Sequence, residues 1–361
     1  MTILPGQKPP AAKRAPRPRA NSVTVRDVAQ AAGVSPATVS RVLNGNERVA
    51  SKLRTHVQRV AGELGYTPHA AARALASQRS RTIAAVVPSL EEPNFAIGVS
   101  ALQQALTSAG YTLLLANSNY DEQEELRQVR ALAAHGIAGM MLVGGRHDAS
   151  VYELLQARRI PFVNTWMLDD RHPSVGFDNY QIGRTIANYL LDLGHTRFGV
   201  VAQRSPRSDR AASRLAGIRQ ALQDRGGRIV REYVIERFHR ILDGQHGLRM
   251  LLEQPERPTA VICGTDTLAF GVLVEAQAQG LRVPADLSVT GINDVEFAAH
   301  LTPPLTTVRL TAAEVGTRAA EYLLARIEGR PVLNTTAIPF SLIVRGSTGA
   351  PGADAAASPA G

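Results

Sequence analysis

Two short amphipathic segments separated by a tight break constrain this chain more than any other feature. They cover residues 25–32 and 36–43, and the break between them contains Gly33. Ser35 can cap the second segment, and Pro36 occupies a first helical position, where a missing N–H costs nothing. Small apolar side chains recur on one face of each segment at helical spacing, so two helices can cross closely there. We therefore predict a helix-turn-helix.

Polar side chains are left on the outer face of this motif. Hydroxyl, amide and guanidinium groups of this kind bond phosphate oxygens and base edges in the major groove of DNA. The candidate DNA-binding residues of the motif are Thr24, Ser35, Ala37, Thr38, Ser40, Arg41 and Asn44. Of these, Ala37 offers only a methyl group. A helical hairpin within a larger bundle is the alternative explanation of the same periodicity.

Basic charge is concentrated around the motif. The chain has a formal net charge of +9, and its front part carries many Lys and Arg but few acids. Such a basic cluster beside a helix-turn-helix indicates a nucleic-acid partner. Residues 1–21 are rich in Pro, Ala, Lys and Arg, and they are predicted to be a disordered tail, with an arm that contacts DNA non-specifically as the alternative.

Composition excludes several other classes of protein. No apolar run approaches the roughly 20 residues of a membrane span, and the N-terminus lacks the apolar core of a secretion signal. Cys263 is the one cysteine, so no internal disulfide can form, and its apolar neighbours predict a buried strand. No cluster indicates a metal, a cofactor or an enzyme, and we expect His56, His195 and His246 at helix surfaces or turns. We expect a soluble cytoplasmic protein.

Two further segments follow the motif. Residues 51–64 are predicted to form a third helix that is capped by Ser51 and whose apolar stripe ends at Leu64. Residues 68–77 then begin with a proline and consist mostly of alanine. So short a helix is marginal alone, and we expect it to order only against a partner.

The order of these residues resembles the DNA-binding head of the lactose-repressor (LacI/GalR) family of bacterial transcription regulators. The matching segments are 24–29, 33–35 and 38–44, and the resemblance extends from about residue 22 to 346. It implies that the Ala-rich segment is a hinge helix, which pairs with its twin and enters the minor groove. By the same match Leu75 is the apolar wedge, and Arg73 is a further DNA-binding residue. A plain linker is the alternative.

Beyond residue 80 the sequence alternates between apolar strands and amphipathic helices, in two series. This alternation is typical of parallel sheets that helices cover on both faces. We predict an α/β fold, with a three-helix head and a two-lobed, doubly wound core. The resemblance adds that such cores are similar to periplasmic sugar-binding proteins, with three crossings between lobes, so that helix 311–328 returns to the first lobe. The predicted parts are a basic tail (1–21), the head (22–67), the hinge helix and linker (68–80), an effector-binding and dimerisation core (81–348) and a disordered tail (349–361).

Several polar and aromatic residues follow predicted strands, and ligands of such sheets bind outside the carboxyl ends of the strands. The candidate effector-binding residues are Asn94, Phe95, Trp166, Asp178, Arg210, Arg214 and Asp266. Carboxylates accept hydrogen bonds from hydroxyl groups, and arginine offers a planar donor fork. The alternatives are a helix cap for Asp266, a surface position for Arg214 and core packing for the aromatic residues. Arg207, Arg210 and Arg214 together favour an anionic effector such as a sugar acid, although a solvated loop explains Arg207 equally well.

The expected function is that of a sequence-specific DNA-binding transcriptional regulator. A homodimer would bind a pseudo-palindromic operator, and a sugar or sugar acid between the lobes would control its affinity. A repressor is favoured, and an effector-dependent activator or a dual regulator stays open. A solute-binding protein would need a signal peptide and no head, which residues 1–77 contradict.

Overall fold

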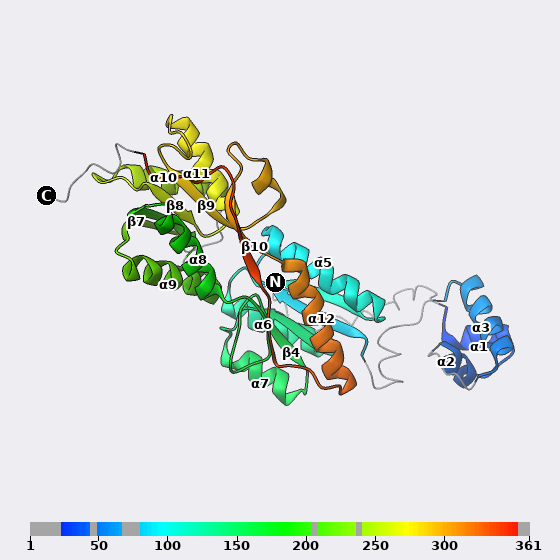
Figure 1. The fold of residues 1–361 in the computed structure, drawn as a ribbon. Coiled ribbons are helices and arrows are strands. Elements are labelled where there is room, and N and C mark those ends of the chain that lie inside the picture. The colour runs from blue at the N-terminus through cyan, green and yellow to red at the C-terminus, as the bar shows by residue number, and fades with distance from the viewer. Residues whose placement is uncertain (1–22, 44–48, 67–79, 204–207, 236–239, 353–361) are drawn as a thin grey trace, which may run out of the picture. The chain divides into compact units, whose positions relative to one another are not determined.

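The structure is a computed structural model that describes residues 23–43, 49–66, 80–203, 208–235 and 240–352 (Figure 1). The chain divides into two compact units, residues 1–80 and 81–361, and each is described by itself. The predictions for Asn44, Arg73, Leu75, Arg207 and the hinge segment lie outside the described residues. No helix within the described ranges is both long and apolar enough to cross a membrane.

The first unit contains the predicted helix-turn-helix. Its helices are α1 (Val25–Ala32), α2 (Pro36–Leu43) and α3 (Ser51–Glu63). A capping box starts α1, because the Asp27 amide donates to the Thr24 hydroxyl (3.3 Å) and the Thr24 amide donates to the Asp27 carboxylate (2.8 Å). Gly33 ends α1 with a φ of +65°, and the Thr38 amide donates to the Ser35 hydroxyl at 3.2 Å. The predicted Ser35 cap is therefore confirmed.

The third helix differs from the prediction at both ends. Ala50, not Ser51, is its N-cap, and no side chain caps it. Leu64 is 38% exposed, although it was expected to end the apolar stripe. Leu64 follows the last helical residue, and the chain turns away at Gly65 (φ +64°), so its side chain leaves the buried face. The core of the head is instead completed by Val57, Val60 and Ala61 of α3.

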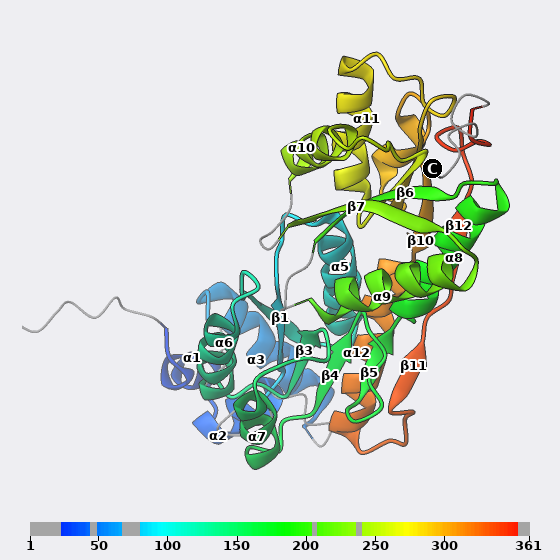
Figure 2. The ribbon, with the colours of Figure 1, turned by 90° about the vertical axis from the view of Figure 1, so that its left-hand side faces the viewer.

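The second unit begins with a parallel sheet, the first lobe. In spatial order its strands are β11 (Thr335–Ala337), β5 (Ser174–Gly176), β4 (Phe162–Thr165), β3 (Gly139–Val143), β1 (Thr82–Val87) and β2 (Thr112–Asn117). One face carries α5 (Pro93–Ser108) and α12 (Ala312–Glu328), and the other carries α6 (Glu122–Ala134) and α7 (Ala149–Ala157) (Figure 2). Side chains of β1 are buried on both faces, as a doubly wound sheet requires.

The second lobe repeats this arrangement. Its strands in order are β12 (Phe340–Ile343), β10 (Thr306–Leu310), β9 (Ser288–Asn293), β8 (Ala260–Cys263), β6 (Arg197–Gln203) and β7 (Arg228–Ile235), and only β12 pairs antiparallel among them. Helices α8 (Asn179–Asp192) and α9 (Asp209–Asp224) cover one face, and α10 (Ile241–Leu252) and α11 (Asp266–Ala278) cover the other. Cys263 is fully buried in β8, as predicted.

The chain passes between the lobes three times, as the resemblance implied. The passages lie between β5 and α8, between β10 and α12, and between β11 and β12. Helix α12 packs along α5 of the first lobe although strands of the second lobe precede it (Figure 1). The predicted return of helix 311–328 is therefore confirmed.

The C-terminal segment corrects two predictions. His195 is only 2% exposed, whereas we expected it at a surface or turn. Its Nε2 lies 2.9 Å from the Gly349 carbonyl oxygen and its Nδ1 lies 2.9 Å from the Thr259 hydroxyl. The Gly349 amide also donates to Ser288 at 3.1 Å. Residues 349–352, which were assigned to a disordered tail, therefore begin with a hydrogen-bonded segment.

Candidate functional site

The outer face of α2 presents the candidate DNA-binding groups of the first unit. Val39 and Val42 point into the head core, whereas Ala37 and Arg41 are exposed and Thr38 is half-buried. This division follows from the helical period, because the buried valines are three residues apart. The exposed edge of α2 can therefore approach a nucleic acid without unfolding the head.

The hydroxyl groups of the head also have structural partners. The Ser35 and Thr38 hydroxyls lie 2.9 Å apart at the start of α2. Hydrogen bonds from the Thr24 backbone and hydroxyl hold the pKa of Asp27 below its usual value. Each hydroxyl has one donor hydrogen, so a phosphate oxygen can replace its side-chain acceptor while the hydroxyl oxygen still accepts from the amide that it caps.

A cavity lies between the two lobes of the second unit. Its empty volume is about 650 Å³, open solvent at its mouth included. The residues that line it come from the start of α5, from the turns after β2 and β4, from the ends of β6, β8 and β9, and from α9. These are carboxyl ends of parallel strands, where doubly wound sheets bind ligands.

Aromatic side chains form one wall of this cavity. The rings of Phe95 and Trp166 meet edge to face, with centroids 5.1 Å apart. The guanidinium carbon of Arg210 lies 5.7 Å from the Phe95 ring centroid, a cation–π contact. Trp166 is 1% exposed and has a φ of +61°, which a bulky residue adopts only where its surroundings impose it.

Arg214 reaches the cavity from α9 and is held by neutral groups. Its Nε donates to Asn179 Oδ1 at 2.8 Å and its Nη1 donates to the Gly264 carbonyl at 3.3 Å. Asn179 in turn donates to the Trp166 carbonyl at 2.9 Å, so it connects Arg214 to the aromatic wall. Burial and then the charge of Arg210 lower the pKa of Arg214 to about 10. The guanidinium therefore still carries its charge at neutral pH.

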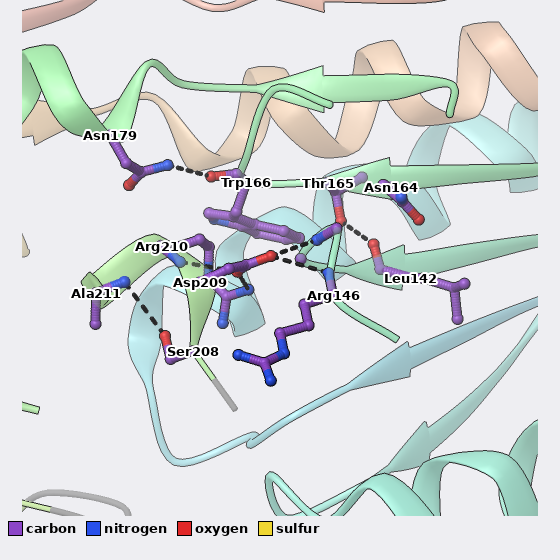
Figure 3. A network of polar contacts seen from close by, with 12 residues as sticks. Leu142, Arg146, Asn164, Thr165, Trp166, Asn179, Ser208, Asp209, Arg210 and Ala211 are labelled. Carbon is purple, nitrogen blue, oxygen red and sulfur yellow. Dashed lines mark hydrogen bonds and ion pairs between the residues drawn. The ribbon is translucent and has the colours of Figure 1, made fainter. Parts of the chain in front are cut away.

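Asp209 joins the two lobes beside this wall (Figure 3). Its Oδ2 accepts hydrogen bonds from the Gly145 amide at 2.6 Å and the Arg146 amide at 3.0 Å, across the lobes. Its Oδ1 accepts from the Arg210 guanidinium at 3.1 Å. One carboxylate thus connects a cavity arginine to the loop that follows β3.

A second polar connection crosses the cavity. The Asn293 amide nitrogen donates to Glu92 Oε1 at 3.0 Å, and Asn94 donates to Asn293 Oδ1 at 3.4 Å. Asn293 ends β9 of the second lobe, and its two partners lie at the start of α5 in the first. All three residues are buried. Both lobes therefore contribute to one hydrogen-bonded set.

Five of the seven predicted effector-binding residues line the cavity, and two do not. Asn94, Phe95, Trp166, Arg210 and Arg214 line it. Asp178 is exposed and caps α8 through the Gln181 amide, which donates to it at 3.0 Å. Asp266 is fully buried, and it accepts from the Val295 amide (2.9 Å) and the Thr307 hydroxyl (2.5 Å). Burial raises the pKa of Asp266 to about 7.

Sequence reasoning missed several residues of the cavity. They include Glu92, Tyr120, Gln203, Ser208 and Asn293. Gln203 and Asn293 end strands β6 and β9, so the rule that singled out residues after strands could have found them. Glu92 and Tyr120 lie in turns whose path the periodicity does not predict.

The comparisons with known proteins agree with this geometry. A model of the lacI family of bacterial regulatory proteins matches residues 24–69, and a model of a periplasmic binding protein-like domain matches residues 187–348. The chain is 32% identical over 330 residues to the HTH-type transcriptional repressor CytR of Escherichia coli (strain K12), which covers 91% of this chain and 96% of CytR. The chain belongs to the LacI family of bacterial transcription regulators. It is a DNA-binding protein of that family, with a helix-turn-helix head and a two-lobed effector-binding core.

Other LacI-family proteins are similar over most of their length. The ribose operon repressor of Haemophilus influenzae is 33% identical over 308 residues, which cover 84% of this chain and 92% of that repressor. The structure of the Lac repressor dimer superposes with a TM-score of 0.83 at 28% identity, over 91% of this chain and 100% of that one. A LacI-family regulator from Silicibacter pomeroyi gives a TM-score of 0.83 at 27% identity, over 90% and 99% of the two chains.

Proposed function

We propose that this LacI-family protein is a homodimeric repressor whose affinity for a pseudo-palindromic operator changes when a small molecule fills the cavity between its lobes. The observation that carries the proposal is the cavity itself, where polar groups of both lobes meet around two arginines and an aromatic wall. A molecule that enters there contacts both lobes at once. Its binding therefore changes the free energy of lobe closure.

The head supplies the operator contacts in this proposal. Arg41 is exposed on α2, and its guanidinium can donate two hydrogen bonds to guanine or bind a phosphate. The remaining proposed DNA-binding residues are Thr24, Ser35, Ala37, Thr38, Ser40 and Asn44 of the motif, with Arg73 and Leu75 added from the family resemblance. Ala37 offers only a methyl group, so its contribution would be contact with a thymine methyl.

Solved relatives support the pairing of these two sites. The Lac repressor dimer has been crystallised with its operator and the anti-inducer ONPF, and the regulator CelR has been crystallised with cellobiose. For this chain, reciprocal linkage follows: an effector that weakens operator binding must itself bind more weakly to the operator complex. The effector-binding residues that we propose are Asn94, Phe95, Trp166, Arg210 and Arg214.

The test begins with the operator. Fragmented genomic DNA is captured on the purified protein and sequenced, and the enriched palindrome is used in gel-shift titrations at fixed salt. We expect Arg41→Ala to weaken binding about tenfold or more, because one good base contact contributes about 1–3 kcal/mol. Arg330→Ala is the matched control, since Arg330 is an exposed arginine of the second unit that pairs with Glu328.

Two results would refute this proposal. One is the absence of any enriched sequence over random duplex. The other is an Arg41→Ala variant that binds the palindrome as tightly as the Arg330→Ala control. A reporter placed behind the palindrome then tests the direction of regulation, because a repressor lowers its expression and an activator raises it.

A further inference from the structure

We propose that the effector carries an anionic group, a carboxylate or a phosphate, and that Arg214 and the indole N–H of Trp166 bind this group. The proposal rests on the proposed effector cavity and names the chemistry of its occupant. It decides between the neutral sugars and the anionic derivatives that the sequence left open. Three observations carry it: donors without acceptors, an arginine whose hydrogen-bond partners are neutral, and the scarcity of carboxylates that line the cavity.

The first observation is that donors in the cavity lack acceptors. Trp166 is 1% exposed, and its Nε1 has no hydrogen-bond partner within the described part of the chain. A buried indole N–H normally has an acceptor, and leaving it without one is unfavourable by about 1–3 kcal/mol. Arg214 Nη2 likewise has no acceptor among the described residues, since only Nε and Nη1 are engaged. Both side chains line the same cavity, where a ligand can bring an acceptor close to them.

The second observation is an unequal pairing of the two arginines. Arg210 has a carboxylate partner, because Asp209 lies 3.1 Å from its Nη1. Within the described ranges, Arg214 makes hydrogen bonds only to the neutral oxygens of Asn179 and Gly264. Burial and then the charge of Arg210 lower the pKa of Arg214, whereas the charges of Glu92 and Tyr120 act in the opposite direction. A ligand anion would give Arg214 a charged partner in direct contact, and arginine binds carboxylate and phosphate through two parallel hydrogen bonds.

The third observation concerns the acceptors that a neutral sugar needs. Sugar hydroxyls donate hydrogen bonds, and carboxylates usually accept them. Among the described lining residues the carboxylate is Glu92, whose Oε1 already accepts from Asn293. Asp178 and Asp266, the two aspartates expected to bind hydroxyls, do not line the cavity, and neither does Asp209, whose oxygens accept from backbone amides and Arg210. A polyol would thus find few carboxylate oxygens there, whereas Trp166 Nε1 is a donor without a partner among the described residues, which favours an anion.

The chain provides its own probe for this site. Trp166 is the only tryptophan, so its fluorescence reports on the cavity of the full-length protein. Matched pairs of ligands are titrated at constant ionic strength: D-gluconate against D-glucose, and ribose 5-phosphate against ribose. Inorganic phosphate is titrated against sodium chloride as the simplest anion. We expect saturable fluorescence changes with anions and at least tenfold weaker binding of the neutral member of the pair that binds.

Three variants locate the effect. Arg214→Gln removes the charge, and we expect it to abolish the preference for the anion. Trp166→Phe keeps an aromatic ring and removes the N–H, and we expect it to weaken anion binding about tenfold. Because this variant has lost the fluorophore, its binding is measured by thermal shift. Arg219→Gln is the control, because Arg219 lies on the same helix, pairs with Glu232 and does not line the cavity. Its anion binding should equal that of the wild type.

The proposal is overturned if the neutral member of a pair binds as tightly as the anion, or if Arg214→Gln retains the preference. It is also overturned if no anion, inorganic phosphate included, gives a saturable change. Operator binding is measured in parallel on the same samples. Anion binding without any operator affinity would refute the proposed function and leave this site intact, and the reverse result would refute only the site.

Discussion

The Oδ2 atom of Asp209, at the start of α9 in the second lobe, lies 2.6 Å from the backbone nitrogen of Gly145 in the first lobe. The same carboxylate also accepts from Arg146 and from the Arg210 guanidinium, which lines the cavity. This side chain therefore both links the lobes and positions a group that an effector can reach. Any change that weakens this carboxylate should alter both lobe closure and effector binding.

We expect Asp209→Asn to weaken lobe closure with little change of shape. The new amide has one acceptor oxygen and one donor, so at least one of the N–H groups now bound by the carboxylate loses its acceptor. Loss of a hydrogen bond to a charged group corresponds to about 1.5–3 kcal/mol. Small-angle scattering should show a larger radius of gyration, and urea unfolding a lower stability. Asp192→Asn is the control, because Asp192 is exposed and pairs with Arg225; equal behaviour of the two variants would contradict the prediction.

A close crossing of α8 and α9 positions Arg214 and predicts a strongly destabilising substitution. A Cβ atom on Gly183 would overlap the Arg214 carbonyl oxygen, and a Cβ atom on Gly217 would overlap that of Tyr180. Both obstacles are backbone atoms and cannot rotate away. We expect Gly183→Ala to lower the free energy of unfolding by about 1–3 kcal/mol and to weaken effector binding. Trp166 fluorescence during urea unfolding measures the first effect, and a ligand titration measures the second.

At Gly62, in contrast to Gly183, we expect substitution by alanine to stabilise the protein. Gly62 lies within α3, and a Cβ atom there would meet no atom within 4 Å. Alanine is a better helix former than glycine by about 0.5–1 kcal/mol, so Gly62→Ala should stabilise the head. Circular dichroism melting of the full-length protein measures this. A lower melting temperature of the head would show that Gly62 has a role that the structure does not reveal.

Asp266 predicts a loss of stability as the pH rises. Burial raises its pKa to about 7 in the folded chain, above the value near 4 of an unfolded aspartate. Between these values the folded state holds a proton that the unfolded state has lost, so stability falls as the pH rises from about 4 to 7. The shift corresponds to at most about 4 kcal/mol. We expect Asp266→Asn to flatten this slope, whereas Asp178→Asn, at the exposed cap of α8, should keep it. Unchanged slopes in urea unfolding of both variants would refute the role of Asp266.

For His195 we expect the opposite pH dependence of the free energy of unfolding, which should fall as the pH is lowered. Its Nε2 faces the Gly349 carbonyl, which only accepts, so Nε2 carries the proton and Nδ1 can accept from Thr259. Burial lowers the pKa of His195, so the unfolded chain takes up a proton first and stability falls as the pH drops below about 6.5. His195→Gln should lose less stability between pH 8 and 5.5 than the wild type. His246→Gln, at an exposed histidine, is the control, and a His195→Gln variant that behaves like it would contradict the prediction.

The sequence predicted best where structure depends on near neighbours. The bounds of α1 and α2 match the expected ranges, because caps and a 3.6-residue period are properties of a few adjacent residues. The sequence did not predict helix α7 or three strands at sheet edges, which are β7, β11 and β12. Two of these strands, β11 and β12, are short and belong to different lobes, and they form only where the returning chain meets a sheet edge.

In the candidate site, the sequence did not predict which of two adjacent residues faces the cavity. Asp178 was expected in the cavity, but it caps α8, and its neighbour Asn179 bonds Arg214. Successive residues on a helix point about 100° apart, so a cap and an inward-facing group can be adjacent. Likewise Thr265 caps α11, and Asp266 turns to Thr307 and Val295. A strand followed by a polar residue predicts the place of the cavity but not which side chain faces it.

By itself, the sequence determined the helix-turn-helix, the alternation of strands and helices, and most of the residues that meet in the cavity. Periodicity, caps and a family resemblance suffice for these, because they depend on residue types in a local order. Only the tertiary structure decided how polar groups pair across the lobes, as Asn94 does with Asn293 and Asp209 does with Gly145. These partners are far apart in the chain, and packing alone determines which donors find an acceptor and which, like Trp166 Nε1, are left without one.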